Sequence, residues 1–380
     1  MNIAFDMVSA VHGGGFKTYN KNILKGLLIE NDDNNYYVFI NKGLNDFFIS
    51  DLKNVHVISI PKIFSKMIFR HIWMQTMLPK YLIQNKIDVH FSPCNIMPII
   101  LKWCNIKKIL VIHSNLPWLY PSVVPGGKIK LFLQKLFTNI SIKIADTIIV
   151  DSKTAKKELI KIFPQINSKI KSIYLGVDSD AFSPKEDINI EYNIIDKIDI
   201  INEPYFLTIS SAVRYHCLKE LIIAYEKICE EYNDIPKYLF ISKNLDSKYF
   251  YELKTIIDTS NYSQKMIFLQ NIDSNQIPHL YKNSNLYIFS SYCEVFGFTN
   301  LEAMSCGVPV ITSNKSALPE ICGDAAIYFD PFDTDDIKNK IINICYNKRQ
   351  KKEMIEKGYH QAKKYTWEKT FQQTKEVIFS

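Results

Sequence analysis

Two glutamates at a fixed spacing are the residues of this sequence best suited to binding a hydroxyl-rich ligand. Glu294 and Glu302 lie eight positions apart in segment 290–321, SSYCEVFGFTNLEAMSCGVPVITSNKSALPEI. An apolar run at 286–291, which predicts a strand, ends just before Glu294. Because a carboxylate accepts hydrogen bonds from paired hydroxyl groups, two carboxylates flanking one turn suit such a ligand. The plainer interpretation, two exposed glutamates on a loop and a helix, is weakened by the apolar neighbours Val295, Phe296, Phe298, Leu301 and Met304.

The turn between the two glutamates is suited to an anion. We predict a helix that begins near Thr299, which places Glu302 in its first turn, where a carboxylate interacts favourably with the helix dipole. The backbone N–H groups at the start of this helix would then be free to hold a phosphate. The candidate ligand-binding residues here are Gly297, Phe298, Thr299, Asn300, Leu301 and Glu302, with the N–H groups taken from Phe298, Thr299 and Asn300.

A basic pair, Arg214 and Lys219, follows the apolar run at 205–211, which predicts another strand. When a phosphorylated group leaves a substrate, negative charge builds up on it, and fixed cations lower the barrier to its departure. The alternative is a solvated loop followed by a lysine at the start of a helix. The position just beyond a strand end favours a functional role for Arg214 more than for Lys219.

Two further candidates lie in the first half of the chain. Gly13, Gly14 and Gly15 follow a strand predicted at 2–8, and such a turn lets a ligand approach the backbone and the next helix N-terminus. Its spacing is neither G-x-G-x-x-G nor a Walker loop, and a simple tight turn explains it equally well. His113 ends the run KILVIH at 108–113, at the edge of a predicted sheet, although a lone histidine there is more often structural.

Short apolar strands and helical stretches alternate twice along the chain, which predicts doubly wound α/β sheets. Helices are expected at about 16–30, 218–232, 335–346 and 351–364, and a last one covers WEKTFQQTKEVIF. The predicted strands are 2–8, 36–40, 55–60, 88–92, 108–113 and 146–152 in the first series, then 205–211, 237–242, 265–269, 286–291, 308–313 and 325–329 in the second.

The domain boundaries follow from a break between these two series. We predict an N-terminal Rossmann-like domain at 1–180, a connection at 181–204, a C-terminal Rossmann-like domain at 205–364 and a C-terminal helix at 365–380. Ligands of open α/β sheets bind at the carboxyl ends of the strands. With two such domains in tandem, we expect the site in a cleft between them, and most of the candidate residues follow strands as this requires.

Composition and targeting signals favour a globular protein of the cytoplasm. Hydrophobic residues make up 47% and charged residues 22% of the 380 residues, which excludes global disorder. None of the eight cysteines forms a C-x-x-C pair, which argues against a structural zinc site, and free thiols indicate a reducing compartment. The N-terminus lacks the basic start of a secretory signal, and no apolar run is long enough to span a bilayer.

The positive charge of the chain is concentrated in its first half. Residues 1–180 carry 23 Lys and Arg against 12 Asp and Glu, and within them 102–171 carries 13 against 3. Segment 125–144, PGGKIKLFLQKLFTNISIKI, predicts a basic amphipathic helix, which suits an anionic membrane surface, although an ordinary half-buried helix is the alternative. Nucleic acid is not expected, because no recognised nucleic-acid-binding pattern is present.

These motifs together resemble one known family. E-V-F-G-F-T-N-L-E-A-M-S-C-G-V-P-V-I resembles the E-x7-E signature of the family-four (group 1) retaining glycosyltransferases, which have the two-domain GT-B fold. YLGVDSDAF-S-P is similar to their interdomain segment, VRYHCLKELIIAYEKI to the segment with their phosphate-binding Arg and Lys, and YTWEKTFQQT to their C-terminal helix, which crosses back onto the first domain. The resemblance spans nearly the whole chain and is most specific in the second half.

The resemblance implies a role for each candidate residue. Glu294 would hold hydroxyls of a donor sugar and Glu302 the ribose hydroxyls of its nucleotide. Arg214 and Lys219 would neutralise the leaving diphosphate. The remaining donor-site roles would fall to Gly14 and Gly15 near the phosphates, to the turn Gly297, Phe298, Thr299, Asn300 and Leu301, and to His113 near the reacting carbon. The chain departs from the family at Ser114, which stands where the family often has an Asp that contacts the sugar or the acceptor.

The implied reaction is a metal-independent transfer, with retained anomeric configuration, from a UDP- or GDP-sugar to a glycan or lipid-linked acceptor. Bacterial relatives make surface polysaccharide such as lipopolysaccharide O-antigen, capsule or exopolysaccharide, so a peripheral position on the inner face of the cell membrane is expected. No cofactor or metal is implied. Two D-x-D motifs, at 178–180 and 333–335, suggest capping or coincidence. The alternatives are a nucleotide-sugar 2-epimerase and a non-catalytic partner subunit with the same fold.

Overall fold

The computed structural model describes residues 1–8, 14–29, 33–42, 54–184 and 203–380, which form two units. Unit 1 consists of Met1–Pro121, Gly127–Gly176 and Trp367–Ser380. Unit 2 consists of Ser122–Gly126 and Val177–Thr366. Of the connection predicted at 181–204, residues 185–202 lie outside the described residues.

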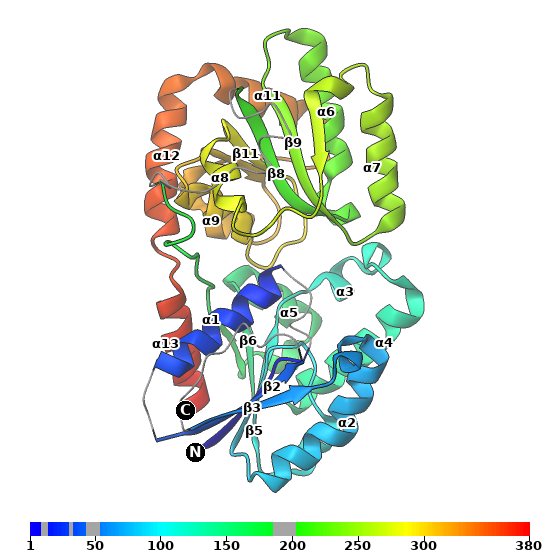
Figure 1. The fold of residues 1–380 in the computed structure, drawn as a ribbon, viewed down its shortest axis with the longest axis vertical. Helices are drawn as coiled ribbons and strands as arrows, with labels where there is room; N and C mark the ends of the chain where they lie inside the picture. The colour runs from blue at the N-terminus through cyan, green and yellow to red at the C-terminus, as the bar shows by residue number, and fades with distance from the viewer. Residues whose placement is uncertain (9–13, 30–32, 43–53, 185–202) are drawn as a thin grey trace. The chain divides into compact units, whose positions relative to one another are not determined.

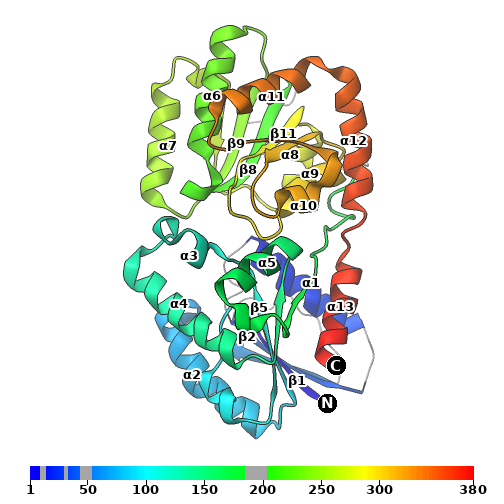
Figure 2. The same cartoon turned by 180° about the vertical axis from the view of Figure 1, so that it is seen from behind.

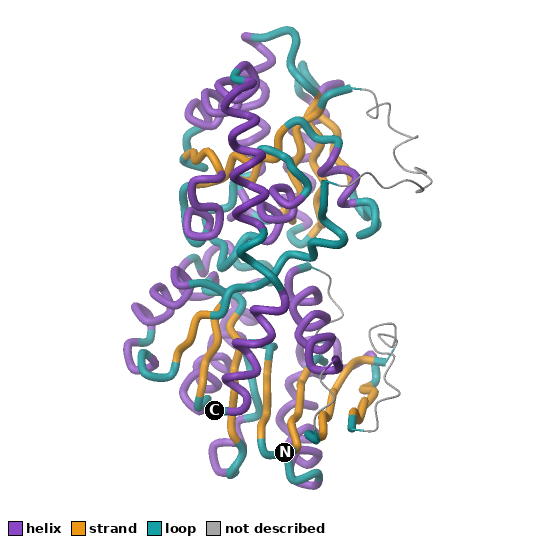
Figure 3. Tube along the Cα trace, turned by 90° about the vertical axis from the view of Figure 1, so that its left-hand side faces the viewer, coloured by secondary structure: helices purple, strands orange, loops and turns teal. Residues whose placement is uncertain are grey.

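Unit 1 is built on a seven-stranded parallel sheet in the order β3-β2-β1-β4-β5-β6-β7. Its strands are apolar and largely buried, as expected of a parallel sheet covered on both faces. Figure 3 shows the strands of this unit edge to edge in one row. The strands are β1 (Asn2–Asp6), β2 (Asn35–Asn41), β3 (Val55–Ile60), β4 (Val89–Ser92), β5 (Lys107–Ile112), β6 (Thr147–Val150) and β7 (Ile170–Ser172).

Helices lie on both sides of this sheet. Helices α1 and α13 lie on one side of the strands and α2 and α4 on the other (Figures 1 and 2). The α-helices of unit 1 are α1 (Gly15–Ile29), α2 (Met67–Gln84), α3 (Leu116–Leu119), α4 (Gly127–Ile144), α5 (Lys153–Ile162) and α13 (Trp367–Phe379), and its 3-10 turns include η2 (Lys62–Ser65) and η3 (Ile99–Trp103).

Helix α13 joins unit 1 although unit 2 precedes it in the sequence. It packs closely on α1, where a Cβ built on Gly26 would lie 2.5 Å from Cγ of the Phe371 ring. The Nζ of Lys107 donates to the carbonyls of Val377 at 2.8 Å and Ile378 at 3.2 Å. A cation at these last carbonyls satisfies acceptors that the helix itself leaves without partners.

Unit 2 repeats the architecture with six parallel strands in the order β10-β9-β8-β11-β12-β13. In both units the chain starts in the middle of the sheet, winds to one edge and then returns to extend the other edge. This order is that of the doubly wound Rossmann sheet, which binds ligands where the order reverses. The strands are β8 (Tyr205–Ala212), β9 (Lys237–Asn244), β10 (Met266–Leu269), β11 (Leu286–Phe289), β12 (Val310–Ser313) and β13 (Ala326–Phe329).

The helices of unit 2 pack their apolar faces onto this sheet. Helix α6 (Leu218–Glu231) buries Leu218, Leu221, Ile222, Tyr225 and Ile228, which recur at helical spacing. Helices α6 and α7 lie on one side of the strands and α9 and α12 on the other (Figures 1 and 2). The remaining helices are α7 (Ser247–Thr259), α8 (Ile277–Lys282), α9 (Phe298–Ser305), α10 (Leu318–Cys322), α11 (Thr334–Tyr346) and α12 (Lys348–Ala362).

The fold predicted from the sequence is confirmed: two parallel, doubly wound α/β sheets. Each predicted strand corresponds to a strand of the structure, and among the strands of the described residues β7 is the one that the sequence did not predict. It has three residues, one of them an exposed lysine, Lys171, so it carries no apolar run. Helix α9 begins at Phe298, near Thr299 as predicted.

The contact between α1 and α13 predicts an unusual response to alanine. Within a helix, alanine normally stabilises over glycine by roughly 0.5–1 kcal/mol. We expect Gly26→Ala to do the opposite and destabilise unit 1 by about 1–3 kcal/mol, because its Cβ would overlap the Phe371 ring. Thermal melting checks this, with Lys25→Ala on the exposed face of α1 as control. The smaller Phe371→Leu should restore stability to the double variant, and a Gly26→Ala protein that melts at or above wild type would contradict the packing.

Candidate active site

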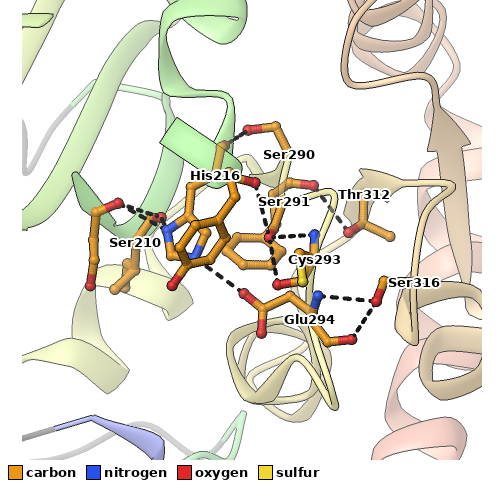
Figure 4. A network of polar contacts seen from close by, with 12 residues as sticks. Ser210, His216, Ser290, Ser291, Cys293, Glu294, Thr312 and Ser316 are labelled. Atoms are coloured by element: carbon orange, nitrogen blue, oxygen red, sulfur yellow. Dashed lines mark hydrogen bonds and ion pairs between the residues drawn. The ribbon is translucent and has the colours of Figure 1, made fainter. Parts of the chain in front are cut away.

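The loops after β8 and β11 form the centre of the candidate site in unit 2. These strands pair with each other at the point where the strand order reverses. The loop after β8 carries the 3-10 turn η7 (Arg214–His216), and the loop after β11 carries Glu294. The Oγ of Ser290 donates to the His216 carbonyl at 2.5 Å, and the Tyr292 N–H donates to the Tyr215 carbonyl at 3.0 Å. The two loops are therefore joined by hydrogen bonds to the backbone carbonyls of η7, and Figure 4 shows the one from Ser290.

Glu294 is held by both its backbone and its side chain. Its N–H donates to Ser316 Oγ at 3.2 Å, and its carbonyl accepts from the same hydroxyl at 2.7 Å. Its Oε1 lies 3.2 Å from Nε2 of His216 (Figure 4). On the other side of the imidazole, Nδ1 lies 2.6 Å from Ser210 Oγ and 2.9 Å from the Ser211 carbonyl oxygen. The carboxylate is thus fixed in direction while it stays partly open to solvent.

His216 is a site residue that the sequence did not identify. The Glu294 carboxylate accepts hydrogen bonds and cannot donate them, so the Nε2 that faces it carries a proton. Nδ1 then accepts from the Ser210 hydroxyl in the neutral ring, or donates to the Ser211 carbonyl in the charged ring. The signal in the sequence was its position two residues after Arg214, beyond the same strand end.

The turn between the two glutamates requires a glycine. Gly297 has a φ of +93°, and a Cβ there would lie 2.6 Å from Cδ2 of Leu318. Helix α9 follows at once and has no side-chain cap. The predicted availability of the Asn300 N–H was wrong, because it donates to the Gly297 carbonyl at 3.2 Å. An uncapped first turn leaves N–H groups that an anion can accept from.

The residues of α9 differ in their burial and in their contacts. Leu301 is fully buried, so only its backbone is available to a ligand. Asn300 is also fully buried, and its side-chain oxygen and nitrogen have no hydrogen-bond partner among the described residues. The ring of Phe298 packs edge-on against Phe296 at 5.2 Å between centroids. Glu302 lies in the second turn of α9, which corrects the prediction that it lies in the first.

Glu302 is half-buried. Removal from solvent raises its pKa to about 7, the nearby Asp178 carboxylate adds to the rise, and a hydrogen bond from the Tyr281 hydroxyl, 3.0 Å from Oε2, opposes it. Tyr281 is itself fully buried. Glu302 is therefore partly protonated at neutral pH, when it can donate as well as accept a hydrogen bond.

The two predicted cations are brought together, and each is paired. Arg214 Nη2 lies 2.9 Å from Oε2 of Glu252, and Lys219 Nζ lies 3.4 Å from its Oε1. The guanidinium of Arg214 also stacks over the Tyr249 ring at 4.9 Å from the centroid. Glu252 and Tyr249 both lie on α7, thirty or more residues after the cations, so this contact could not be predicted from the sequence.

His113 lies in unit 1 at the end of β5, with a carboxylate behind it. Its Nδ1 is 2.9 Å from Oδ2 of Asp151, which follows β6 and is buried. Its ring meets the edges of Phe16 and Tyr19 at 5.7 and 4.5 Å between centroids. Because Asp151 accepts from Nδ1–H, the neutral ring keeps its lone pair on Nε2, which has no partner among the described residues. The sequence missed Asp151, although it is a polar residue at a strand end.

The glycine turn of unit 1 is only partly described. Gly13 lies outside the described residues. Gly14 has a φ of +107°, no atom lies within 4 Å of a Cβ built on it, and Gly15 begins α1. Both glycines are exposed, so the backbone at this helix start is open to a ligand.

The D-x-D motifs are explained by local structure. Asp333 caps α11, accepting from the N–H groups of Asp335 and Asp336. Asp178 accepts from the N–H groups of Asp180 and Ala181 in a turn. Within the part of the chain that the structure describes, no three His, Cys, Asp or Glu side chains are grouped as metal ligands.

Comparison with known proteins agrees with this geometry. The family model for glycosyl transferases group 1 matches residues 191–361, and the model for glycosyltransferase family 4 matches residues 13–181. The chain belongs to the family-four glycosyltransferases. Both E-x7-E glutamates and the basic pair of this glycosyltransferase lie within the first of these matches.

Its relatives include enzymes of O-antigen synthesis. It is 26% identical to O-antigen chain mannosyltransferase B of Escherichia coli, over 70% of this chain and 69% of that protein. It is 23% identical to O-antigen chain mannosyltransferase RfbU of Salmonella typhimurium, over 65% and 67%. Its fold is similar to that of Anabaena HepE, solved with UDP and glucose, with a TM-score of 0.76 and 17% identity over the full length of both chains.

The raised pKa of Glu302 predicts that replacing it with glutamine changes the stability of the protein in a pH-dependent way. Glu302 titrates near pH 7 when folded and near its ordinary 4.5 when unfolded, so the folded state binds the proton more tightly. The free energy of unfolding therefore falls as the pH rises from about 4.5 to about 7, and this loss is absent below about pH 4.5. We expect Glu302→Gln to differ from wild type by less than about 1 kcal/mol in thermal melting near pH 5 and to be more stable, by up to about 3 kcal/mol, at pH 8.

The control for this measurement is Glu353→Gln, which removes one exposed carboxylate from α12. A stability difference between Glu302→Gln and wild type that is the same at pH 5 and pH 8 would show that Glu302 is not the titrating group.

Proposed function

We propose that this glycosyltransferase transfers a sugar from a nucleotide-diphosphate donor to a glycan or lipid-linked acceptor of a surface polysaccharide, with retained configuration and without a metal. The observation that carries the proposal is the joining of the Glu294 loop to the Arg214 loop where the strand order of unit 2 reverses. Because the two named relatives are O-antigen mannosyltransferases, a mannosyl donor such as GDP-mannose is the first candidate.

In this proposal unit 2 holds the donor. Glu294, fixed by His216, accepts from the sugar hydroxyls, and Glu302 accepts from the ribose hydroxyls. Arg214 and Lys219 neutralise the diphosphate, with the first turn of α9 adding N–H groups and the positive end of its dipole. This cationic environment supplies the stabilisation of the leaving group that a bound metal supplies in other transferases.

The proposed chemistry proceeds on one face of the sugar. The bond from the anomeric carbon to the diphosphate oxygen breaks as positive charge develops on the sugar. The acceptor oxygen bonds to the same face, and its proton passes to the departing phosphate oxygen. His113 of unit 1, oriented by Asp151, presents Nε2 as an acceptor for a sugar hydroxyl. Gly14 and Gly15 leave the backbone at the start of α1 open to the phosphates.

Unit 1 also supports the proposed contact with an anionic membrane. Most of the exposed large hydrophobic side chains among the described residues lie between 57 and 136. On α4 they are Ile129, Phe132 and Leu136, with 80%, 64% and 41% of each side chain exposed, and they recur at helical spacing. The neighbouring α2 exposes Ile68, Phe69 and Ile72, and η3 exposes Ile100 and Trp103.

The charged side chains of this surface are basic. Segments 61–87 and 89–145 contain no Asp or Glu, and Lys62, Lys66, Lys102, Lys128 and Lys130 are exposed among the apolar side chains. The elements are neighbours, since η3 contacts both α2 and α4, and the rings of His71 and Phe137 lie 4.6 Å apart. Apolar side chains among lysines suit the interface of an anionic bilayer. No helix of the described residues is long and apolar enough to cross a bilayer.

The donor is tested with a panel of UDP- and GDP-sugars in EDTA, measuring thermal shift and release of nucleotide. We expect one donor to bind and to be slowly hydrolysed, and Glu294→Ala and Arg214→Ala to lose at least tenfold in affinity or rate, since each removes a charged hydrogen bond. Glu353→Ala and Arg349→Ala, which remove the paired exposed charges of α12, should behave as wild type.

Each alternative mechanism or function predicts a different result in the same assay. A requirement for Mn²⁺ would contradict the metal-free mechanism. Conversion of the donor into its 2-epimer would identify an epimerase, and no response to any donor would favour a non-catalytic subunit.

The membrane surface is tested by sedimentation with vesicles. We expect the wild type to bind vesicles rich in phosphatidylglycerol, more weakly as salt rises, and to bind pure phosphatidylcholine poorly. Ile129→Glu with Phe132→Glu should weaken binding by more than about tenfold, because two exposed apolar side chains that the bilayer would bury are lost. The control is Leu245→Glu with Tyr346→Glu, which changes two side chains of unit 2 that are 58% and 63% exposed. Equal effects of the two pairs, or equal binding to both lipids, would overturn the assignment.

A further inference from the structure

The two cations assigned to the diphosphate converge on one carboxylate. Glu252 receives Arg214 on one oxygen at 2.9 Å and Lys219 on the other at 3.4 Å. About 43% of the side chains of Arg214 and Lys219, and 31% of that of Glu252, are open to solvent. The three charged groups therefore lie at an accessible surface, where a soluble anion can reach the cations.

Helix α7 supplies both this carboxylate and a second support for the cations. Tyr249 lies one turn before Glu252 and stacks its ring under the Arg214 guanidinium at 4.9 Å. The Tyr249 hydroxyl accepts from the Lys219 backbone N–H at 3.1 Å. Because Tyr249 contacts the Arg214 guanidinium and the Lys219 backbone without ionic pairing, these contacts do not depend on Glu252. The aromatic ring can thus keep Arg214 in place when its ionic partner changes.

Glu252 is the ion-pair partner of Arg214 and Lys219 in this structure. Partial burial acts to raise the pKa of Glu252, but the hydrogen bonds and charges of Arg214 and Lys219 outweigh this and hold the pKa below its ordinary value. Glu220 also faces this group, and its pKa is raised, first by burial and in part by the Glu252 charge. Glu252 is accordingly the carboxylate that carries the negative charge of the ion pairs at neutral pH.

We propose that Glu252 is the resident counter-ion of the diphosphate site: it pairs with Arg214 and Lys219 in the empty site, releases them to the diphosphate of the donor, and recaptures them as the nucleoside diphosphate leaves. The inference rests on the proposed function, because it takes these cations as the diphosphate ligands. Glu252 is then a positioning residue that competes with substrate and product for the same two cations.

The strength of the pairing is suited to such an exchange. Ion pairs that are open to solvent are weak and are screened by salt, so a diphosphate with a larger charge can replace a single carboxylate. After transfer, the same carboxylate is held within reach on α7 and competes with the product for both cations. This competition lowers the affinity of the site for the diphosphate product, and the product is therefore released faster. In many enzymes product release limits turnover.

The first experiment measures binding of pyrophosphate, UDP and GDP to the full chain in EDTA at low salt. We expect Glu252→Gln to bind pyrophosphate and the preferred nucleotide about three- to tenfold more tightly than wild type, because the competing charge is removed. Asp258→Asn, the same change of charge on an exposed residue of α7, should bind as wild type. The gain from Glu252→Gln should shrink at high salt, and it should also be smaller in the Arg214→Ala background, where Lys219 is the remaining cation that Glu252 pairs with.

Kinetics separate competition from a structural role. With the donor found in the panel, Glu252→Gln should lower both the KM for donor and the inhibition constant of the nucleoside diphosphate product, without raising kcat. A carboxylate that only holds Arg214 in place would give the reverse, with weaker binding of all three anions in Glu252→Gln.

The failure of the inference differs from the failure of the proposed function. If wild type binds the nucleotides through Arg214 while Glu252→Gln binds them equally or more weakly, the counter-ion role is overturned and the donor site stands. If wild type binds neither UDP nor GDP, and Arg214→Ala changes nothing, both fail together.

Discussion

The pairing of β8 with β11 is the constraint on which the candidate site depends. These strands are about eighty residues apart in sequence, and they pair directly at Phe206 with Leu286 and at Leu207 with Tyr287. The Thr208 hydroxyl donates across the pair to the Ile288 carbonyl at 2.7 Å. Beyond their carboxyl ends the chain turns in opposite directions along the sheet, so the two loops are left side by side. One supplies the cations and His216, and the other supplies Glu294.

The sequence predicted the elements well because the elements depend on local patterns. Apolar runs marked the strands of both sheets, and a turn followed by a helix was predicted between the two glutamates. Helix α9 starts near Thr299 as predicted, and Gly297 at positive φ, rather than a side-chain cap, precedes it. Because the helix begins at Phe298, Glu302 lies in the second turn and not in the first, and the Asn300 N–H, predicted to be free, donates to Gly297.

The partners of the candidate residues could not be predicted in the same way. His216 pairs with Glu294, Asp151 with His113, and Glu252 with both cations, and the partners lie 33 to 78 positions apart in sequence. No periodicity links such residues, and the sheet topology alone brings them together. The exposed apolar side chains of α2 and η3 were missed because an apolar helix residue is ordinarily a core residue, and only the fold shows which ones are left uncovered.

The discontinuity of unit 1 has a consequence for the synthesis of the chain. Helix α13, which covers the face of α1 that includes Gly26, follows the whole of Val177–Thr366 in the sequence. At the ordinary speed of translation, on the order of 5–20 residues per second, unit 1 waits roughly 10–40 s for this helix. During that time the α1 face and the amine of Lys107 lack the partners that they have in the finished protein. The nascent first unit is therefore an incomplete intermediate of the kind that chaperones bind, and it becomes complete only after its neighbour has emerged.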